Sequence, residues 1–233
     1  MVSLIIPTCE ERENIEPLLA RLAAVRSRLE EPLEVLVVDS SSQDGTAACA
    51  RHTLHREALG HVIVASTRCD VAQAVRLGIR QAAGDLIGVM DADLSHPPEL
   101  LPALVKAIRN EGVQVAVASR YVRGGGLAGW PWHRKVLSRL GNLVVRPLTP
   151  VADATSGYFV CEAPLMRSVE RPLSGFKVLL EPLVTGRAHR VEEIPYVFTD
   201  RQRGASKLRP RILWAYAKQL ARLYWERCRR SAR

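Results

Sequence analysis

Five short apolar runs, separated by segments with helical spacing, constrain the fold of this chain more than any other feature of its sequence. Most runs are apolar on both faces, and they span residues 2–7, 33–39, 61–66, 84–91 and 113–120. Between the first two, Asn14–Leu29 carries apolar residues three and four positions apart, as in a helix with one buried face. We also expect a helix capped by Asp44, a helix over Asp70–Ala83 and a helix that begins near Pro98. This alternation predicts an α/β fold with a largely parallel sheet covered by helices.

The pattern changes after Arg120. Residues 121–135, "YVRGGGLAGWPWHRK", combine glycines, a proline and two tryptophans. This composition predicts an irregular, mobile loop over one face of the sheet, too irregular for a strand, and such loops often carry function. A helix is expected over about Trp132–Val145, followed by strands in residues 155–161 and 191–200, a loop and a final helix.

Composition disfavours several classes of protein. No apolar run reaches the roughly 18 residues of a membrane-spanning helix, and we expect no signal peptide in "MVSLIIPTCEE". The five cysteines are scattered and form no CxxC pair, which argues against zinc and a disulfide framework and fits a reducing cytosol. Of the 33 basic residues, 11 lie in residues 201–233 beside one acidic residue. The rest of the chain is close to neutral, which argues against a nucleic-acid binder.

Carboxylates stand at the ends of three expected strands. Asp91 and Asp93 follow the fourth run, Asp39 ends the second, and Glu10–Glu11 follow the first. Ligands of open parallel sheets bind beyond the carboxyl ends of the strands. Asp91 and Asp93 have two explanations: with Ser95 they cap the next helix, or they form a magnesium or manganese site that holds a diphosphate. Magnesium takes few protein ligands and completes its shell with phosphates and water, so two carboxylates suffice.

Seven blocks between residues 2 and 208 carry a family resemblance. They are "IPTCEERENI", "VVDSSSQDGT", "GDLIGVMDADLSHPPELL", "SRYVRGGGLAGWPWHRKVLSR", "TSGYFV", "GFKVLLE" and "VEEIPYVFTDRQRGASKL". In this order and spacing the chain resembles the polyprenol-phosphate hexosyltransferases of glycosyltransferase family 2, and among them the dolichol-phosphate mannosyltransferases. The resemblance implies a GT-A fold, a Rossmann-like single domain. It also implies transfer of a hexose, with mannose and GDP-mannose as the expected sugar and donor, to a polyprenyl phosphate with inversion.

The resemblance assigns roles on the donor side. Asp91 and Asp93 would hold Mg²⁺ or Mn²⁺ and the donor diphosphate, and Ser95 stands at the position of a third metal ligand. The residues that would line the nucleoside pocket are Pro7, Glu11 and Asp39. The family usually has two acidic residues and a glycine where this chain has Asp39, Ser40 and Ser41. This departure lies in the nucleoside pocket, so the base and the sugar of the donor stay open.

The resemblance also assigns roles on the acceptor side. Arg120, Arg134 and Ser138 match positions that hold the acceptor phosphate, and Arg201 and Lys207 match a basic pair that closes over the diphosphate. The residue chemistry agrees. A lipid phosphate has a second pKa of about 6, so it is already an anionic nucleophile and needs no strong base. Arginine forks suit phosphate, and a metal with two basic side chains would stabilise the leaving diphosphate.

The tail "RPRILWAYAKQLARLYWERCRR" predicts a basic amphipathic helix that starts near Pro210. Its apolar side chains recur at helical spacing: Leu213, Tyr216, Ala217, Leu220, Leu223 and Tyr224. Two explanations are open for this face: it packs on the domain, or it lies at a membrane surface with its arginines on anionic lipids. Many relatives have transmembrane segments or membrane-bound partner subunits, so a membrane-protein partner is a further implication.

These observations give one principal hypothesis and two alternatives. Residues 1–208 form a GT-A catalytic domain and residues 209–233 the C-terminal helix of a glycosyltransferase at the cytoplasmic face of a membrane. The alternatives are the same fold with a UDP-sugar donor or another lipid acceptor, and a membrane-binding module without catalysis.

Overall fold

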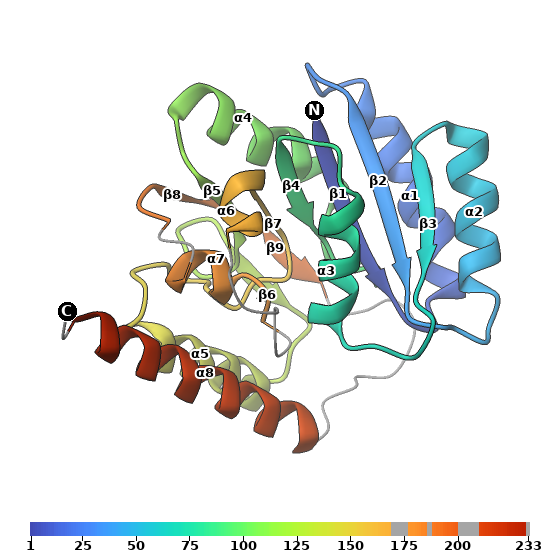
Figure 1. The fold of residues 1–233 in the computed structure, drawn as a ribbon. Coiled ribbons are helices and arrows are strands. Elements are labelled where there is room, and N and C mark those ends of the chain that lie inside the picture. The colour runs from blue at the N-terminus through green and yellow to red at the C-terminus, as the bar shows by residue number, and fades with distance from the viewer. Residues whose placement is uncertain (169–176, 186–187, 200–209, 232–233) are drawn as a thin grey trace.

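The structure, a computed structural model, describes residues 1–168, 177–185, 188–199 and 210–231. Within this part of the chain, the main sheet has the strand order β3-β2-β1-β4-β7-β5-β8 (Figure 1). The strands are β1 Val2–Thr8, β2 Leu33–Asp39, β3 Gly60–Val64, β4 Leu86–Val89, β5 Val115–Ser119, β7 Phe159–Glu162 and β8 Val191–Pro195. Neighbouring strands are parallel except around β7, which is antiparallel to β4 and β5. The predicted, largely parallel sheet is therefore confirmed.

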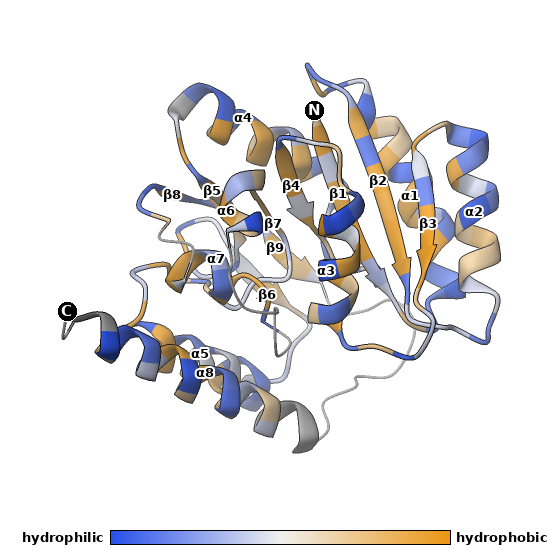
Figure 2. Cartoon of the chain, viewed as in Figure 1, coloured by the Kyte–Doolittle hydropathy of each residue, from blue (hydrophilic) through white to orange (hydrophobic). Residues whose placement is uncertain are grey.

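Helices cover both faces of this sheet, because its strands are apolar on both sides. In β1, Leu4 and Ile6 join one core and Ile5 joins the other, as the alternation of strand side chains requires. Figure 2 shows that β1 and β2 are mostly hydrophobic along their length. The first core includes α1 Arg12–Arg26, α2 Thr46–Glu57 and α4 Leu101–Glu111, which follows the short helix η1 Pro98–Leu100. The second includes α3 Val71–Gln81, α6 Ala163–Arg167, α7 Leu180–Val184, α8 Pro210–Ser231 and the end of α5 Trp132–Val145.

The glycine-rich segment contains a strand, which corrects the prediction that it is too irregular for one. β6 Gly126–Ala128 pairs in parallel with β9 Val197–Thr199 to form a second, two-stranded sheet. The Gly126 N–H also donates a hydrogen bond to the Tyr196 carbonyl at 3.1 Å. Three residues show no periodicity, and the partner that holds them lies some seventy positions later in the sequence. Local pattern therefore could not reveal this strand.

The start of α2 also differs from its prediction. The residue that caps the helix is Gly45, whose φ of 88° is a conformation that glycine adopts without strain. Asp44 instead ties two segments together, because its carboxylate accepts hydrogen bonds from the backbone N–H groups of Thr46 at 2.9 Å and Arg12 at 3.0 Å. Helix α3, by contrast, is capped by Asp70 through a reciprocal capping box with Gln73.

Helix α8 packs on the domain through the face that carries its buried leucines. Leu220 and Leu223 are buried in the second core. The hydroxyls of Tyr216 and Tyr224 donate hydrogen bonds to backbone carbonyls of α5, so the two helices lie side by side (Figure 1). Arg222 forms an ion pair with the buried Glu181 carboxylate of α7. For this face, packing on the domain is the explanation that the structure supports.

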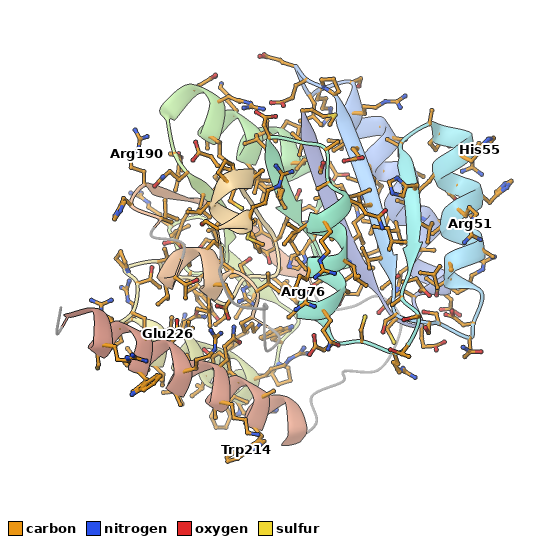
Figure 3. The ribbon with its side chains drawn as sticks, in the orientation of Figure 1. Arg51, His55, Arg76, Arg190, Trp214 and Glu226 are labelled. Carbon is orange, nitrogen blue, oxygen red and sulfur yellow. The ribbon has the colours of Figure 1, made fainter. Side chains whose placement is uncertain are left out.

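The opposite side of α8 faces solvent. Trp214 is 65% exposed and projects away from the domain (Figure 3), and Trp225 is 56% exposed. Within the described residues, no helix combines the length and the hydropathy that a membrane span requires.

Candidate active site

The carboxyl ends of β1, β2 and β4 bring the predicted donor-side residues to one edge of the sheet. Thr8, the last residue of β1, lies opposite Asp39, the last residue of β2. The Thr8 hydroxyl donates a hydrogen bond to the Asp39 carboxylate at 3.2 Å. β4 pairs with β1 on its other side and leads directly into Asp91 and Asp93. The strand order thus explains why acids that are far apart in sequence share this edge.

The predicted nucleoside pocket contains a buried carboxylate held in place by a tight loop. Asp39 is buried and accepts hydrogen bonds from the Ser42 N–H at 2.9 Å and the Ser42 hydroxyl at 2.7 Å. The loops on either side contain two non-glycine residues at positive φ, Glu10 at 58° and Ser41 at 52°. Such backbone strain often marks ligand sites.

The other two predicted residues of this pocket flank the same edge. Pro7 lies in β1 opposite Val38. Glu11 precedes α1, where its carboxylate accepts a hydrogen bond from the Asn14 side-chain amide at 2.8 Å. The structure therefore places Pro7 near the end of β1 and Glu11 in the segment between β1 and α1.

Asp91 and Asp93 do not cap the next helix. The residue before η1 is Pro97, and no side chain caps that helix. Instead the Asp93 carboxylate accepts hydrogen bonds from the N–H of Ser95, at 3.1 Å, and from its hydroxyl. Asp93 is buried, whereas the Asp91 side chain is 44% exposed. Of the two explanations given by the sequence, the capping one is therefore wrong.

The oxygens at this strand end fit a hard divalent cation. The described residues include no group of three His, Cys, Asp or Glu side chains that could hold a metal ion. The oxygen-bearing side chains predicted to hold one are the Asp91 and Asp93 carboxylates and the Ser95 hydroxyl. Such a set suits magnesium or manganese, which would draw further ligands from a diphosphate and water. Gly157 keeps room for the site, because a Cβ at this position would lie 2.5 Å from Oδ2 of Asp91.

His96 lies beneath these carboxylates and was not predicted as a site residue. Its Nδ1 is 3.7 Å from Asp91 Oδ2, and its ring packs against those of Tyr158 and Tyr196. Burial lowers the pKa of His96 to about 4, although the negative charge of Asp93 opposes this shift. The imidazole is therefore neutral at pH 7, and its packing restricts where the Asp91 carboxylate can lie. The histidine of the "DADLSHPPE" block was the available signal.

Arg120, predicted to hold an acceptor phosphate, has most of its guanidinium engaged. Its Nε and Nη2 atoms donate to the two carboxylate oxygens of the fully buried Asp153, both at 2.7 Å. The Arg120 backbone N–H donates to the same carboxylate at 2.9 Å. Asp153 thus fixes the side chain and neutralises its charge. Sequence reasoning missed Asp153 because it stands 33 positions away in an irregular segment.

Aromatic rings link Arg120 to the other two predicted acceptor residues. The Arg134 guanidinium carbon lies 3.9 Å from the ring centroid of Trp130, and this ring packs edge-on against Phe198 at 5.2 Å. Phe198 in turn lies 5.7 Å from the guanidinium carbon of Arg120. The hydroxyl of Tyr121, the residue after Arg120, donates to the Ser138 hydroxyl at 2.7 Å. The second sheet, β6 with β9, supplies the frame for this cluster.

Lys177 is a further cation at the site that sequence reasoning missed. Its ammonium donates to the Thr155 carbonyl at 2.9 Å, and the Thr155 hydroxyl accepts from Arg120 Nη2 at 3.3 Å. Burial and the nearby Arg120 cation lower the pKa of Lys177 from 10.5 to about 8, although Asp91 and Asp153 oppose this shift. The lysine stands in the "GFKVLLE" block, which was the available signal. Arg201 and Lys207 lie outside the described residues.

Comparison with known proteins gives a consistent family and fold. The family model described as "Glycosyl transferase family 2" matches residues 3–165. A dolichol-phosphate mannosyltransferase of Pyrococcus furiosus is 38% identical over 97% of this chain, which spans 64% of that relative. The corresponding enzyme of Saccharomyces cerevisiae is 32% identical over 95% of this chain and 86% of its own length.

Solved structures share the same fold at low sequence identity. A glucosyl-3-phosphoglycerate synthase of Mycobacterium tuberculosis, solved with Mn²⁺, UDP-glucose and phosphoglyceric acid, has a TM-score of 0.71 and 18% identity over 98% of this chain and 79% of its own. A mannosyltransferase of Pyrobaculum calidifontis, in complex with GDP-mannose and Mn²⁺, has a TM-score of 0.65 and 21% identity over 98% of this chain and 64% of its own. The GT-A-like fold expected from the sequence is therefore confirmed.

Proposed function

Because the chain belongs to glycosyltransferase family 2, we propose that it is an inverting, metal-dependent enzyme that moves mannose from GDP-mannose to a polyprenyl phosphate. The observation that carries this proposal is the pairing of two unlike sites. Asp91 and Asp93 would form an oxygen-donor site at the sheet edge, and the ring cluster around Arg134 reaches that edge through Phe198, which packs against both Trp130 and His96. A donor diphosphate suits the first site and an acceptor phosphate the second.

Each side chain then has a defined task. Asp91, Asp93 and Ser95 would hold Mg²⁺ or Mn²⁺, which neutralises the donor diphosphate when bound. Arg134 and Ser138 orient the acceptor phosphate, whose oxygen attacks the sugar from the face opposite the diphosphate. Arg201 and Lys207 receive the negative charge of the leaving group.

The remaining residues support this arrangement. Asp153 keeps the Arg120 guanidinium in one orientation, in which it would help to hold the acceptor phosphate. Lys177 adds a positive charge between the two sites. Pro7, Glu11 and Asp39 bind the nucleoside.

A transfer assay tests the proposal directly. The protein is incubated with manganese, polyprenyl phosphate and a panel of radiolabelled GDP- and UDP-sugars, and lipid-extractable label is measured. We expect label from GDP-mannose only, and none when the lipid phosphate is replaced by the free alcohol. If only a UDP-sugar transferred label, the donor would be that UDP-sugar and not GDP-mannose. If no sugar is transferred and no nucleotide raises the melting temperature in manganese, the chain is a binding module without this activity.

The depressed pKa of Lys177 predicts an alkaline limit to activity. Because this pKa is about 8, the ammonium loses its proton as the pH rises through 8, and the attraction for phosphate is lost with it. We expect kcat/KM to fall above pH 8 in the wild-type protein. In Lys177→Arg the charge persists at all these pH values, so the fall should move to higher pH. Identical pH profiles for the two proteins would show that Lys177 has no role in the reaction.

We also propose that the protein lies on the cytoplasmic face of a membrane, through exposed apolar residues of α5 and α8. Trp132 is 76% exposed and Leu143 is 63% exposed. Four more apolar side chains of α5 are about half exposed: Val136, Leu137, Leu140 and Val144. On α8, Trp214 and Trp225 are both exposed, and they stack with the cations of Lys218 and Arg229. Exposed aromatics beside basic residues suit the headgroup region.

Vesicle sedimentation tests this location with neutral substitutions. We expect the wild-type protein to sediment with anionic vesicles, and Leu140→Gln combined with Trp214→Gln to weaken sedimentation at least about tenfold, since both side chains lose apolar contact. His55→Gln on α2, far from Trp214 in Figure 3, is the matched control and should sediment normally. Deleting α8 would be a poor test because its leucines fill the core. Equal sedimentation of all three proteins would contradict the proposed surface.

A further inference from the structure

A basic cavity adjoins the acceptor side of the candidate site. It has a volume of about 590 Å³ and lies between residues 120–125 and one face of α5. Four arginines and no acidic residue line it: Arg120, Arg123, Arg139 and Arg146. We call this cavity the arginine groove. Apart from Arg120, none of these arginines has a role in the proposed transfer reaction.

The loop that forms one wall of the groove depends on glycine. Gly124 has a φ of 92°, and a Cβ on Gly125 would lie 2.6 Å from the Ser119 carbonyl oxygen. The chain therefore folds back on Arg120 and leaves a gap beside α5. On the opposite wall, the buried side chain of Asn142 is fixed because its oxygen accepts a hydrogen bond from the Thr155 N–H at 3.2 Å. The groove is thus bounded by fixed backbone and a fixed helix.

The charge of the groove is not balanced from within the protein. Arg120 is neutralised by Asp153, and Arg146 donates to the Pro150 carbonyl, which carries no charge. Arg123 and Arg139 are exposed, and no ion pair joins either of them to another side chain of the described residues. Three guanidinium charges therefore line one cavity without an acid. Guanidinium forks bind phosphate oxygens in pairs, so a phosphate group is the matching ligand.

The groove shares Arg120 with the proposed acceptor site but lies on a different face of α5 from Arg134. Arg139 follows Arg134 by five residues, which places the two side chains about 140° apart around the helix. Arg134 lies on the ring of Trp130, whereas Arg139 lines the groove with Leu143. One phosphate in contact with Arg134 is therefore not the phosphate that Arg139 faces.

We propose that the arginine groove binds the phosphate ester of an anionic lipid headgroup, as a site additional to the acceptor-phosphate site. The choice of a lipid follows from Leu143, which lines the groove and is 63% exposed, and from its half-exposed neighbours Leu140 and Val144. A phosphate in the groove would leave attached acyl chains next to this apolar strip. The bound headgroup would hold α5 against the lipid surface, so this inference extends the proposed membrane location.

Calorimetry with monomeric ligands tests the groove without a membrane. Short-chain phosphatidylglycerol, kept below its micelle concentration, and glycerol 3-phosphate are titrated into the full chain without donor or metal. We expect one site for the lipid and weaker binding of glycerol 3-phosphate. Arg123→Gln and Arg139→Gln should each lower lipid affinity at least about tenfold, since each removes a charged fork. Arg51→Gln on the exposed side of α2 removes the same charge outside the groove and should change affinity less than about twofold.

Four results would overturn the inference. One is absence of lipid binding, and another is an equal loss of affinity in Arg139→Gln and Arg51→Gln. Binding of glycerol 3-phosphate as tight as that of the lipid would show a soluble phosphate ligand instead. Because calorimetry measures lipid binding without sugar transfer, the test of the groove remains valid even if the protein lacks the proposed activity. In the transfer assay, a rise in acceptor KM for Arg139→Gln as large as that for Arg134→Ala would make the groove part of the acceptor site.

Discussion

Replacing Asp93 with asparagine is expected to lower the turnover of mannose transfer at least roughly a hundredfold, the scale of losing a main electrostatic stabiliser. The Asp93 carboxylate is buried at the end of β4, and the Ser95 N–H and hydroxyl fix its orientation. Asparagine keeps the size of the side chain but removes the charge that a divalent cation requires. Initial rates at saturating donor and acceptor measure the effect.

Asp85→Asn is the matched control, because Asp85 precedes the same strand at its other end and pairs there with Arg109. This variant should transfer mannose at the wild-type rate. Wild-type protein in excess chelator should behave like Asp93→Asn. Full activity of Asp93→Asn, or of the chelated wild type, would contradict a metal at this position.

Arg134→Ala is expected to reduce kcat/KM for polyprenyl phosphate by roughly a hundredfold, because two charge-assisted hydrogen bonds to phosphate are lost. Donor affinity, measured by calorimetry with GDP-mannose and manganese, should stay within about twofold of the wild type. Arg134→Lys keeps the charge without the paired donors, so its kcat/KM for polyprenyl phosphate should lie between those of the wild type and Arg134→Ala. Arg51→Ala, on the exposed side of α2 (Figure 3), is the control for the loss of one arginine.

The two measurements separate the sides of the proposed site. Lost donor affinity in Arg134→Ala would mean that this arginine serves the diphosphate and that the acceptor assignment is wrong. An effect on both ligands would indicate that the Trp130–Phe198 cluster has collapsed, which near-ultraviolet circular dichroism would detect.

The sequence predicts the strand-and-helix order of the first 120 residues because each element there carries its own periodicity. The grouping of Asp39 with Asp91 and Asp93 follows from the same pattern, since parallel strands end at one edge. The contacts that complete the site lack such a signal. Asp153 pairs with Arg120 across 33 positions, and Lys177 bonds to Thr155 across 22. Only the folded chain brings these charges together.

The second sheet illustrates the same limit. β6 and β9 are three residues each, and the sequence predicts a strand over the β9 residues but not its partner β6. The spacing of apolar residues in α8 predicts which face of the helix is buried, but it does not predict what that face packs against. Spacing specifies which side chains share a face, and both a protein core and a lipid surface can cover that face.

Because β7 is antiparallel to β4 and β5, its first residue lies at the edge of the sheet where those two strands end. Phe159, its first residue, pairs with Val89 at the end of β4 and with Val117 near the end of β5. For this strand, the residues that come before it in sequence reach the candidate site, and the residues that follow it emerge at the far side. Gly157, two positions upstream, lies against Asp91. Extra residues inserted after Glu162 would therefore shift the start of α6, on the side of the sheet remote from the site, whereas a single insertion before Phe159 would displace the backbone that leaves space for the Asp91 carboxylate.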